Sequence, residues 1–517
     1  MTEPNAAIND KREIFGWAMY DWANSAFSTT IGAAFLGKYI YELAKQAAAQ
    51  YPDGIARLFG VPIAPASAWA FTTALSVVFQ AGLLPIFGAI ADYSHRRKQM
   101  LQIFATIGGL TTVAMFFVSG TNWWLGSLLY IIANIAFGAA IVFYNAYLPD
   151  IASEDERDRV SSYGWAMGYL GGGILLAVNL ALFIFAENLG ISSTLAVRIN
   201  LASAGLWWLG FSSVTWKRLR SRHTAKSLPA GENILSVAFR QLSETMGAPA
   251  RLIAILLLSP LLIVIWAPLI APTVLRFLTV QHLPEDLAIL PIFLPVLGPL
   301  AMLVIFLRKK ARELPETSKF LTSYLVYNDG IQTVIPMAAT FAGAALVEGG
   351  LELPDDITYS AILMIQFVAF GGALLWGRLA KRIGSKEAII TSLVIWAAAV
   401  TYAYFGMKGE NRIIEFLALA AVIAIVLGGS QAISRSVFAQ MIPKSKEAEY
   451  FSIYEISERG SSWLGPVLFG IANQVFGSLR YGILSLIFFF LVGLILLPFV
   501  NVRKAIADVR AFDEASS

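Results

Sequence analysis

The sequence predicts an all-α integral membrane protein whose two halves are copies of one another. Hydrophobic residues make up 57% of the 517 positions and charged residues only 14%, well below the share typical of soluble proteins. Apolar runs of about 18 residues or more recur along the chain, and each is long enough to cross about 30 Å of hydrocarbon. Repeated motifs then relate the first half of the chain to the second.

Two pairs of motifs carry this relation. The first pair keeps a constant spacing of 294 positions, so that Pro149, Leu170 and Gly171 recur as Pro443, Leu464 and Gly465. The second pair consists of Gly88–Asp92 and Gly377–Lys381, each followed by basic residues. Duplicated halves in so hydrophobic a chain indicate a secondary transporter whose substrate site lies where the halves meet.

We predict about fourteen transmembrane spans, with six on each side of an extra central pair. They cover residues 14–40, 66–91, 99–119, 123–148, 160–186, 193–214, 252–275, 287–307, 320–346, 357–377, 386–406, 412–438, 452–476 and 479–500. The N-terminal bundle occupies 14–216 and the C-terminal bundle 320–500. A short N-terminus (1–13), a linker (217–319) and a tail (501–517) complete the chain.

The linker is predicted to hold an amphipathic surface helix at 232–246 and a transmembrane hairpin at 252–307. Six prolines interrupt this hairpin, at positions 260, 268, 272, 291, 295 and 299, so both of its helices should be kinked or broken. The hairpin is either an accessory element that modulates gating or an insertion that fills a lipid-facing groove. The sequence favours the second interpretation.

Charge distribution predicts the orientation. If the N-terminus is cytoplasmic, the inner segments hold 30 of the 38 Lys and Arg residues, as the positive-inside bias requires. The first ten residues are polar and lack the order of a cleaved signal peptide, so we expect the first span to act as an uncleaved insertion signal. The prediction is a multi-pass protein of the cell (inner) membrane with both termini cytoplasmic.

Several functional classes are excluded. The chain has no cysteine, and its three histidines are scattered in or beside loops, so we expect no metal site and no other cofactor. It also lacks the glycine-rich loop of ATP-driven transporters. The net charge of +4 is spread over alternate loops, which argues against nucleic acid as a partner. We expect a monomer in the lipid bilayer that is not an enzyme.

Six motifs spread over both halves point to a known family. They are Tyr20-Asp-Trp-Ala-Asn-Ser-Ala-Phe27, Tyr144-Asn-Ala-Tyr-Leu-Pro149, Gly168-Tyr-Leu-Gly-Gly-Gly173, Tyr327-Asn-Asp-Gly-Ile-Gln332, Gly428-Gly-Ser-Gln-Ala432 and Ser461-Ser-Trp-Leu-Gly-Pro466. Together they resemble the vacuole-effluxer-like branch of the major facilitator superfamily, which includes autophagy-related vacuolar amino-acid effluxers. The resemblance implies a major facilitator fold of two six-helix bundles and efflux-type transport, with amino acids as the best-attested cargo.

The sequence departs from this family pattern in two places. The central hairpin is extra relative to a twelve-span scheme. Lys381 stands where the second copy of the loop motif would more often carry an acid. That replacement is expected to weaken or invert the charge pairing between the halves.

Asp329 lies deep in a predicted span. It is about ten residues from the start, or about 15 Å at 1.5 Å per residue, with Asn328, Gln332 and Pro336 close by. A carboxylate at that depth is costly and rarely faces lipid. We predict that Asp329, Asn328 and Gln332 belong to the substrate or proton pathway, where Asp329 takes a coupling proton or pairs with a substrate amine. The alternative is a buried Asp that neighbouring donors hold to interrupt the helix.

Asp21 and Asn24 align with Asp329 and Gln332 and are the counterparts in the first half. Trp17, Tyr20 and Trp22 flank Asp21, so it is either a cavity residue or an anchor at the membrane interface. Asn24 lies deeper and is predicted to face the pathway, as are Tyr144, Asn145 and Gln431. Four charged residues lie at inner span ends and form either a cytoplasmic gate or, as the sequence favours, solvated or structural ion pairs: Arg435, Glu455, Glu458 and Arg459.

The first loop motif is similar to the cytoplasmic loop motif of the superfamily. On this resemblance, Gly88 permits close helix approach, Asp92 caps a helix or pairs across the interface, and Arg96 or Arg97 answers an acid of the other half. These four residues would form a conformational latch worth a few kcal/mol at most. The alternative is that the basic residues serve only as topology signals.

The leading hypothesis is an alternating-access transporter that exports a small polar solute, with amino acids and protons as candidate substrates. A flippase for lipids or envelope precursors on the same fold is the first alternative, although the predicted spans hold few of the cations that it would need. An integral-membrane enzyme is the second alternative, and the sequence lacks the clustered polar residues at one membrane face that such an enzyme requires.

Overall fold

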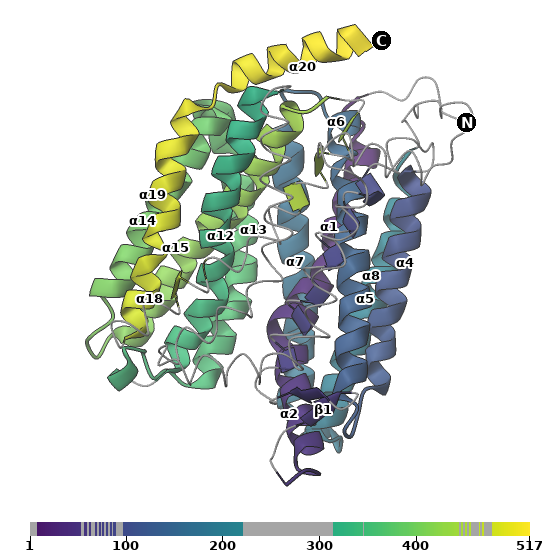
Figure 1. The fold of residues 1–517 in the computed structure, drawn as a ribbon, viewed down its shortest axis with the longest axis vertical. Helices are drawn as coiled ribbons and strands as arrows, with labels where there is room; N and C mark the ends of the chain where they lie inside the picture. Colours follow the sequence, from purple (N-terminus) through teal and green to yellow (C-terminus); the bar gives the residue numbers. More distant parts are fainter. Residues whose placement is uncertain are drawn as a thin grey trace, which may run out of the picture.

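A computed structural model describes residues 8–52, 97–220, 314–344, 346–443 and 478–516, together with scattered positions in 56–88 and 446–469. These residues form two helical halves that stand side by side (Figure 1). The N half contains α1 (Lys11–Ala26), α2 (Leu36–Ala48), α4 (Arg97–Ala114), α5 (Trp123–Asn145), α6 (Leu148–Ile151), α7 (Arg157–Ile184) and α8 (Ser193–Arg218). The C half contains α12 (Pro315–Gly343), α13 (Asp355–Ile383), α14 (Ser385–Phe405), α15 (Arg412–Gln440), α18 (Leu479–Ser485), α19 (Ile487–Leu496) and α20 (Val502–Ser516).

Within the described part of the chain, seven helices are long and apolar enough to cross a membrane. The predicted all-α membrane class therefore agrees with the structure, whereas the count of about fourteen spans stays a prediction. The hairpin at 252–307 and the surface helix at 232–246 lie outside the described residues. A short antiparallel hairpin of β1 (Ala56–Leu58) and β2 (Val61–Ile63) follows α2.

The first helix is continuous from α1 into α2 through a π-helical segment, Phe27–Phe35. Its start is fixed by Asp10, whose side chain accepts the backbone N–H of Arg12 and satisfies one of the free donors at a helix N-terminus. Asp10 also pairs with Arg220 just after α8. The first and last helices of the N half are thereby tied together at one end.

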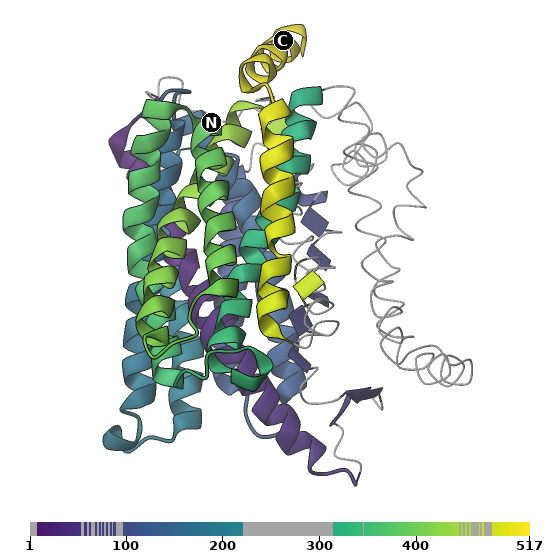
Figure 2. The same ribbon diagram turned by 90° about the vertical axis from the view of Figure 1, so that its left-hand side faces the viewer.

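That end of the molecule carries α6 and α20, and α2 and β1 lie at the other end (Figures 1 and 2). We call the first end the α20 face. Along the seam between the halves, α7 of the N half packs against α13 and α15 of the C half. One hydrophobic core fills the C half and continues into the N half near the α20 face, while the far end of the N half has a separate core. The halves are thus packed together most extensively toward the α20 face.

Candidate functional site

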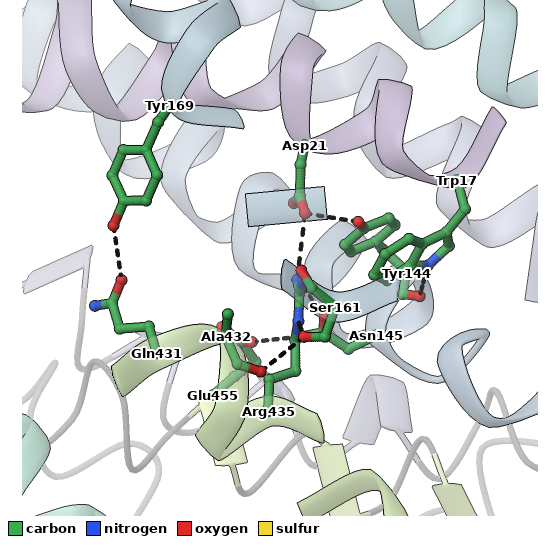
Figure 3. A network of polar contacts seen from close by, with 10 residues as sticks. All are labelled: Trp17, Asp21, Tyr144, Asn145, Ser161, Tyr169, Gln431, Ala432, Arg435 and Glu455. Atoms are coloured by element: carbon green, nitrogen blue, oxygen red, sulfur yellow. Dashed lines mark hydrogen bonds and ion pairs between the residues drawn. The ribbon is translucent and has the colours of Figure 1, made fainter. Parts of the chain in front are cut away.

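Arg435 of α15 lies at the seam and donates its described hydrogen bonds to the N half (Figure 3). Its Nε donates to Ser161 Oγ at 2.9 Å, and its Nη2 to the Ser161 carbonyl at 2.8 Å. Its Nη1 lies 3.3 Å from Asp21 Oδ2 and 3.4 Å from Asn145 Oδ1. A guanidinium on the C half is therefore held by a carboxylate, an amide and a serine of the other half.

Aromatic rings of the N half surround the same guanidinium. Arg435 Cζ lies 5.0 Å from the ring centroid of Trp17, 5.8 Å from that of Tyr144 and 5.4 Å from that of Trp165. These distances are within the range of cation–π attraction, which is strongest where water is excluded. We call Arg435, Trp17, Asp21, Tyr144, Asn145, Ser161 and Trp165 the Arg435 cluster.

Asp21 is buried in this cluster and is fixed by the N half. The Tyr144 hydroxyl donates to Asp21 Oδ2 at 2.7 Å. Gly164 of α7 permits the close approach, because a Cβ at that position would lie 2.6 Å from the same oxygen. Trp17 and Tyr20 have no exposed surface within the protein, so neither serves as a membrane-interface anchor. Asp21 thus faces the other half of the molecule.

Further polar contacts extend the seam on both sides of the cluster. Asn145 donates to Glu455 of the C half at 2.9 Å, and Ser161 Oγ donates to the Ala432 carbonyl at 2.8 Å. Tyr169, near the middle of α7, donates to Gln431 at 3.2 Å. Tyr144, Asn145 and Gln431, all predicted as pathway residues, therefore lie at the interface between the halves, with Gln431 apart from the other two.

At the α20 face, the loop motif of each half contacts the segment that follows the repeated proline of the other half. Arg97, which follows the first loop motif, pairs with Glu447 after Pro443 at 3.0 Å and with Asp150 of its own half at 3.2 Å. Lys381 of the second loop motif donates to Glu156, in the loop after Pro149, at 2.7 Å. Each loop motif thus places a base on an acid in the opposite half.

Both pairs have the same polarity, because each joins a base on or just after a loop motif to an acid that follows the repeated proline of the opposite half. Of the predicted latch residues, Arg97 is buried against the other half and Gly88 is buried, while Asp92 and Arg96 lie outside the described residues. Burial raises the pKa of Glu447 well above its ordinary value, and Arg97 opposes this shift.

Asp329 occupies a different environment within the C half. Its side chain is 1% exposed, and neither carboxylate oxygen has a hydrogen-bond partner among the described residues. The backbone amide of Gly465 lies close to this carboxyl, but their geometry falls short of a hydrogen bond. Asn328 is fully buried and its amide is likewise unpaired in the described part of the chain. Hydrogen bonds from Asn328 or Gln332 that would hold Asp329 are therefore not found there.

The repeat explains why the two acids differ. At the 294-position spacing, Tyr144 corresponds to Phe438 and Arg435 corresponds to Ile141. The positions that repeat the hydroxyl and the guanidinium of the Asp21 site thus carry apolar side chains. Among the described residues, no hydrogen bond joins Asp329 to the Arg435 cluster. Within the described part of the chain, Asp21 and Asp329 therefore occupy separate sites, the first paired and the second unpaired.

Most of the acids and amides of the site can be identified from the sequence, but its centre cannot. The sequence favours ion pairing for Arg435, but the residues near it along the chain do not indicate that its partners lie in the other half. Trp165 and Ser161 do not stand out in the sequence at all. The available signal is an arginine inside an apolar predicted span, which requires a counter-charge somewhere in the fold. Asn24 is buried, and its amide nitrogen has no partner in the described region.

Reversing the charge of Lys381 tests whether its pair with Glu156 holds the halves together at the α20 face. We expect Lys381→Glu to separate the halves there, because two acids would face each other, and Lys381→Glu with Glu156→Lys to restore closure. Since the chain has no cysteine, spin labels on cysteines introduced at Asp155 and Glu387 report the distance between the halves. Arg510→Glu is the matched control, because its pair with Glu154 is more exposed and should matter less. Equal distances between the labels in all variants would contradict a role for the Lys381–Glu156 pair in holding the halves together.

The same labels test pH dependence. The hydrogen bond from Lys381 holds the pKa of Glu156 below its usual value. A carboxylate with a lowered pKa keeps its pairing above the ordinary carboxyl range and loses it as pH falls through the lowered value. We expect the distance between labels to stay constant through neutral and mildly acidic pH. Separation at mildly acidic pH in the wild type, but not in Glu156→Gln, would contradict this assignment.

Comparison with known proteins places these features in a family. The sequence profile described as "Vacuole effluxer Atg22 like" matches residues 9–265 and 272–510. The chain is 28% identical over 487 residues to the uncharacterized MFS-type transporter YxiO of Bacillus subtilis (strain 168), covering 94% of both. It is 27% identical over 511 residues to Autophagy-related protein 22 of Yarrowia lipolytica (strain CLIB 122 / E 150), covering 86% of this chain and 77% of that protein.

Solved structures give the fold. The proton:xylose symporter XylE matches with a TM-score of 0.61 and 14% identity over 97% of both chains. The human organic anion transporter MFSD10 matches with a TM-score of 0.57 and 15% identity, covering 94% of this chain and 99% of that one. At such identities the likeness concerns the fold alone, and it confirms the prediction of a major facilitator architecture.

Proposed function

The chain belongs to the vacuole effluxer Atg22-like family of major facilitator transporters, and we propose that it exports a small polar solute by alternating access. Family and fold are those of a membrane transporter rather than an enzyme. The solute that we propose is an amino acid, the cargo that the resemblance of the six motifs to vacuolar effluxers implies. Alternating access requires the two halves to part at one face of the membrane while they close at the other.

The observation that carries the proposal is the crosswise engagement of the repeats at the α20 face. Arg97 with Glu447, Lys381 with Glu156, and Arg435 with Asp21 all join the N half to the C half there. Ion pairs between two bodies can be exchanged as the bodies rock, because each body keeps its own packing. The structure then represents the state in which the α20 face is closed.

We assign the α20 face to the cytoplasm on the positive-inside bias, since 30 of the 38 Lys and Arg residues fall on that side of the predicted topology. Both termini would then be cytoplasmic and the protein would reside in the inner membrane. A single chain supplies both halves of the seam, which supports a monomer as the functional unit. Separation of the three ion pairs would open a path to the cytoplasm.

Asp329 is our candidate for proton coupling. A buried carboxyl without a partner is least costly in its neutral form, so a change in its surroundings during transport can bind or release a proton. The Arg435 cluster has no such vacancy, because Asp21 is already neutralised by Arg435. In this proposal the proton site and the gate are therefore separate.

Transport in proteoliposomes tests the function. Purified protein would be assayed with a panel of radiolabelled amino acids, with and without a pH gradient, against empty vesicles and a charge-reversed Lys381→Glu variant. We expect saturable uptake of at least one amino acid that increases with the gradient. Absence of amino-acid transport at any pH would contradict the substrate assignment and would direct the search to amphiphilic cargo.

A further inference from the structure

We propose that the N-half part of the Arg435 cluster is a binding site for an organic cation, which Arg435 fills while the α20 face is closed. The site takes a primary ammonium or a guanidinium group. This inference rests on the proposed alternation of access, and it names the part of the substrate that the N half would recognise.

The cation-binding groups come from the N half alone. They comprise the Asp21 carboxylate, the Ser161 hydroxyl and carbonyl oxygens, the Asn145 amide oxygen and the rings of Trp17 and Tyr144 (Figure 3). The ring of Trp165 lies beside the same guanidinium. A carboxylate flanked by aromatic faces is the arrangement that proteins use to bind ammonium and guanidinium groups. The described hydrogen bonds of Arg435 all end on these residues, so the C half contributes the cation and the N half contributes the site.

The site is held together by contacts within the N half. Trp17 and Tyr144 stack with their ring centroids 4.4 Å apart, and the Trp17 indole nitrogen donates to the Tyr144 carbonyl at 3.0 Å. The Tyr144 hydroxyl in turn donates to Asp21. None of these contacts involves the C half. When the halves separate, we therefore expect the rings and the carboxylate to move as one body while Arg435 leaves with α15.

Departure of Arg435 leaves a charge imbalance in the N half. Asp21 is buried, and a buried carboxylate without a counter-charge is strongly unfavourable. A cation of similar shape restores the balance, because the aromatic faces and the oxygen acceptors are already in position. A neutral amide lacks the charge, and an anion would face the carboxylate. The chemistry thus selects a cationic head group, such as the ammonium group of an amino acid.

Binding to purified protein tests this proposal. The variant Arg435→Gln removes the internal cation, and ethylguanidinium chloride in the millimolar range is the probe, with ethylurea as its neutral counterpart at equal ionic strength. We expect ethylguanidinium to raise the thermal unfolding midpoint of Arg435→Gln and to leave that of the wild type unchanged, because only the variant has a vacant site. Ethylurea should have no such effect.

The double variant Arg435→Gln with Asp21→Asn is the specificity control, and its affinity for ethylguanidinium should be at least about tenfold lower. If Arg435→Gln does not fold, Lys381→Glu keeps the whole cluster while favouring separation of the halves, and should bind the probe in its place. Equal responses to ethylguanidinium and ethylurea, or binding that survives Asp21→Asn, would overturn the site. Cation binding without any amino-acid transport would support the site and count against the transport proposal. Amino-acid transport without cation binding would support the transport proposal and overturn the site.

Discussion

Replacing Arg435 with alanine is expected to abolish transport and to lower the free energy of unfolding by about 3–5 kcal/mol, the cost typical of removing one partner of a buried ion pair. The loss arises because Asp21 stays buried without its counter-charge and because Ser161 loses a donor. The measurements are reversible unfolding in mixed micelles and amino-acid uptake in proteoliposomes.

The neutral double variant separates charge from packing. Asp21→Asn with Arg435→Gln removes both charges, so we expect it to recover most of the lost stability, as replaced buried ion pairs commonly do. We expect transport to remain impaired, because the pair is needed to close the α20 face reversibly. If the double variant is as unstable as the single one, the ion pair is not the source of the effect.

Asp329→Asn is expected to remove the pH dependence of transport while leaving the protein folded. Asparagine has nearly the shape of a neutral aspartic acid, and the described residues offer no ion pair that the substitution would break. The free energy of unfolding should therefore change by less than about 1 kcal/mol. Uptake driven by a pH gradient should fall at least about tenfold, whereas exchange without a gradient should persist.

Two comparisons make this prediction specific. Asp329→Glu keeps an exchangeable proton and should retain part of the gradient-driven flux. Asp21→Asn, at the matching position of the other half, should cost stability because it strands Arg435 in a buried site. Unchanged pH-dependent flux in Asp329→Asn would remove Asp329 from the coupling mechanism.

The repeated motifs allowed much of the site to be anticipated. Pro149, Pro443 and the two loop motifs could be identified by spacing, because duplicated halves conserve the geometry of their own turns. The base at Lys381 was expected to weaken or invert the charge pairing; the structure shows that Lys381 pairs with Glu156 of the other half, and the inversion stays a prediction because Asp92 lies outside the described residues. The spans 160–186 and 412–438 coincide with α7 and α15 to within a few residues, since apolar runs bounded by charge define a span.

Contacts between the halves could not be anticipated in the same way. Asp21 and Arg435 are 414 positions apart, and no local pattern pairs them. Trp17 and Tyr20 looked like interfacial aromatics from their distance along the span, yet both are buried within the protein. Depth along a helix can be read from sequence, whereas the direction in which a side chain points depends on what packs beside it.

The sequence by itself determined the membrane class, the duplication and the presence of an acid at corresponding places in both halves, because these features depend only on hydropathy and spacing. The tertiary structure alone decided which acid is neutralised. Packing of α15 against α7 brings Arg435 to Asp21, while Asp329 has no hydrogen-bond partner among the described residues. Charge pairing across a seam depends on how two bodies dock, and that information is spread over both halves of the chain.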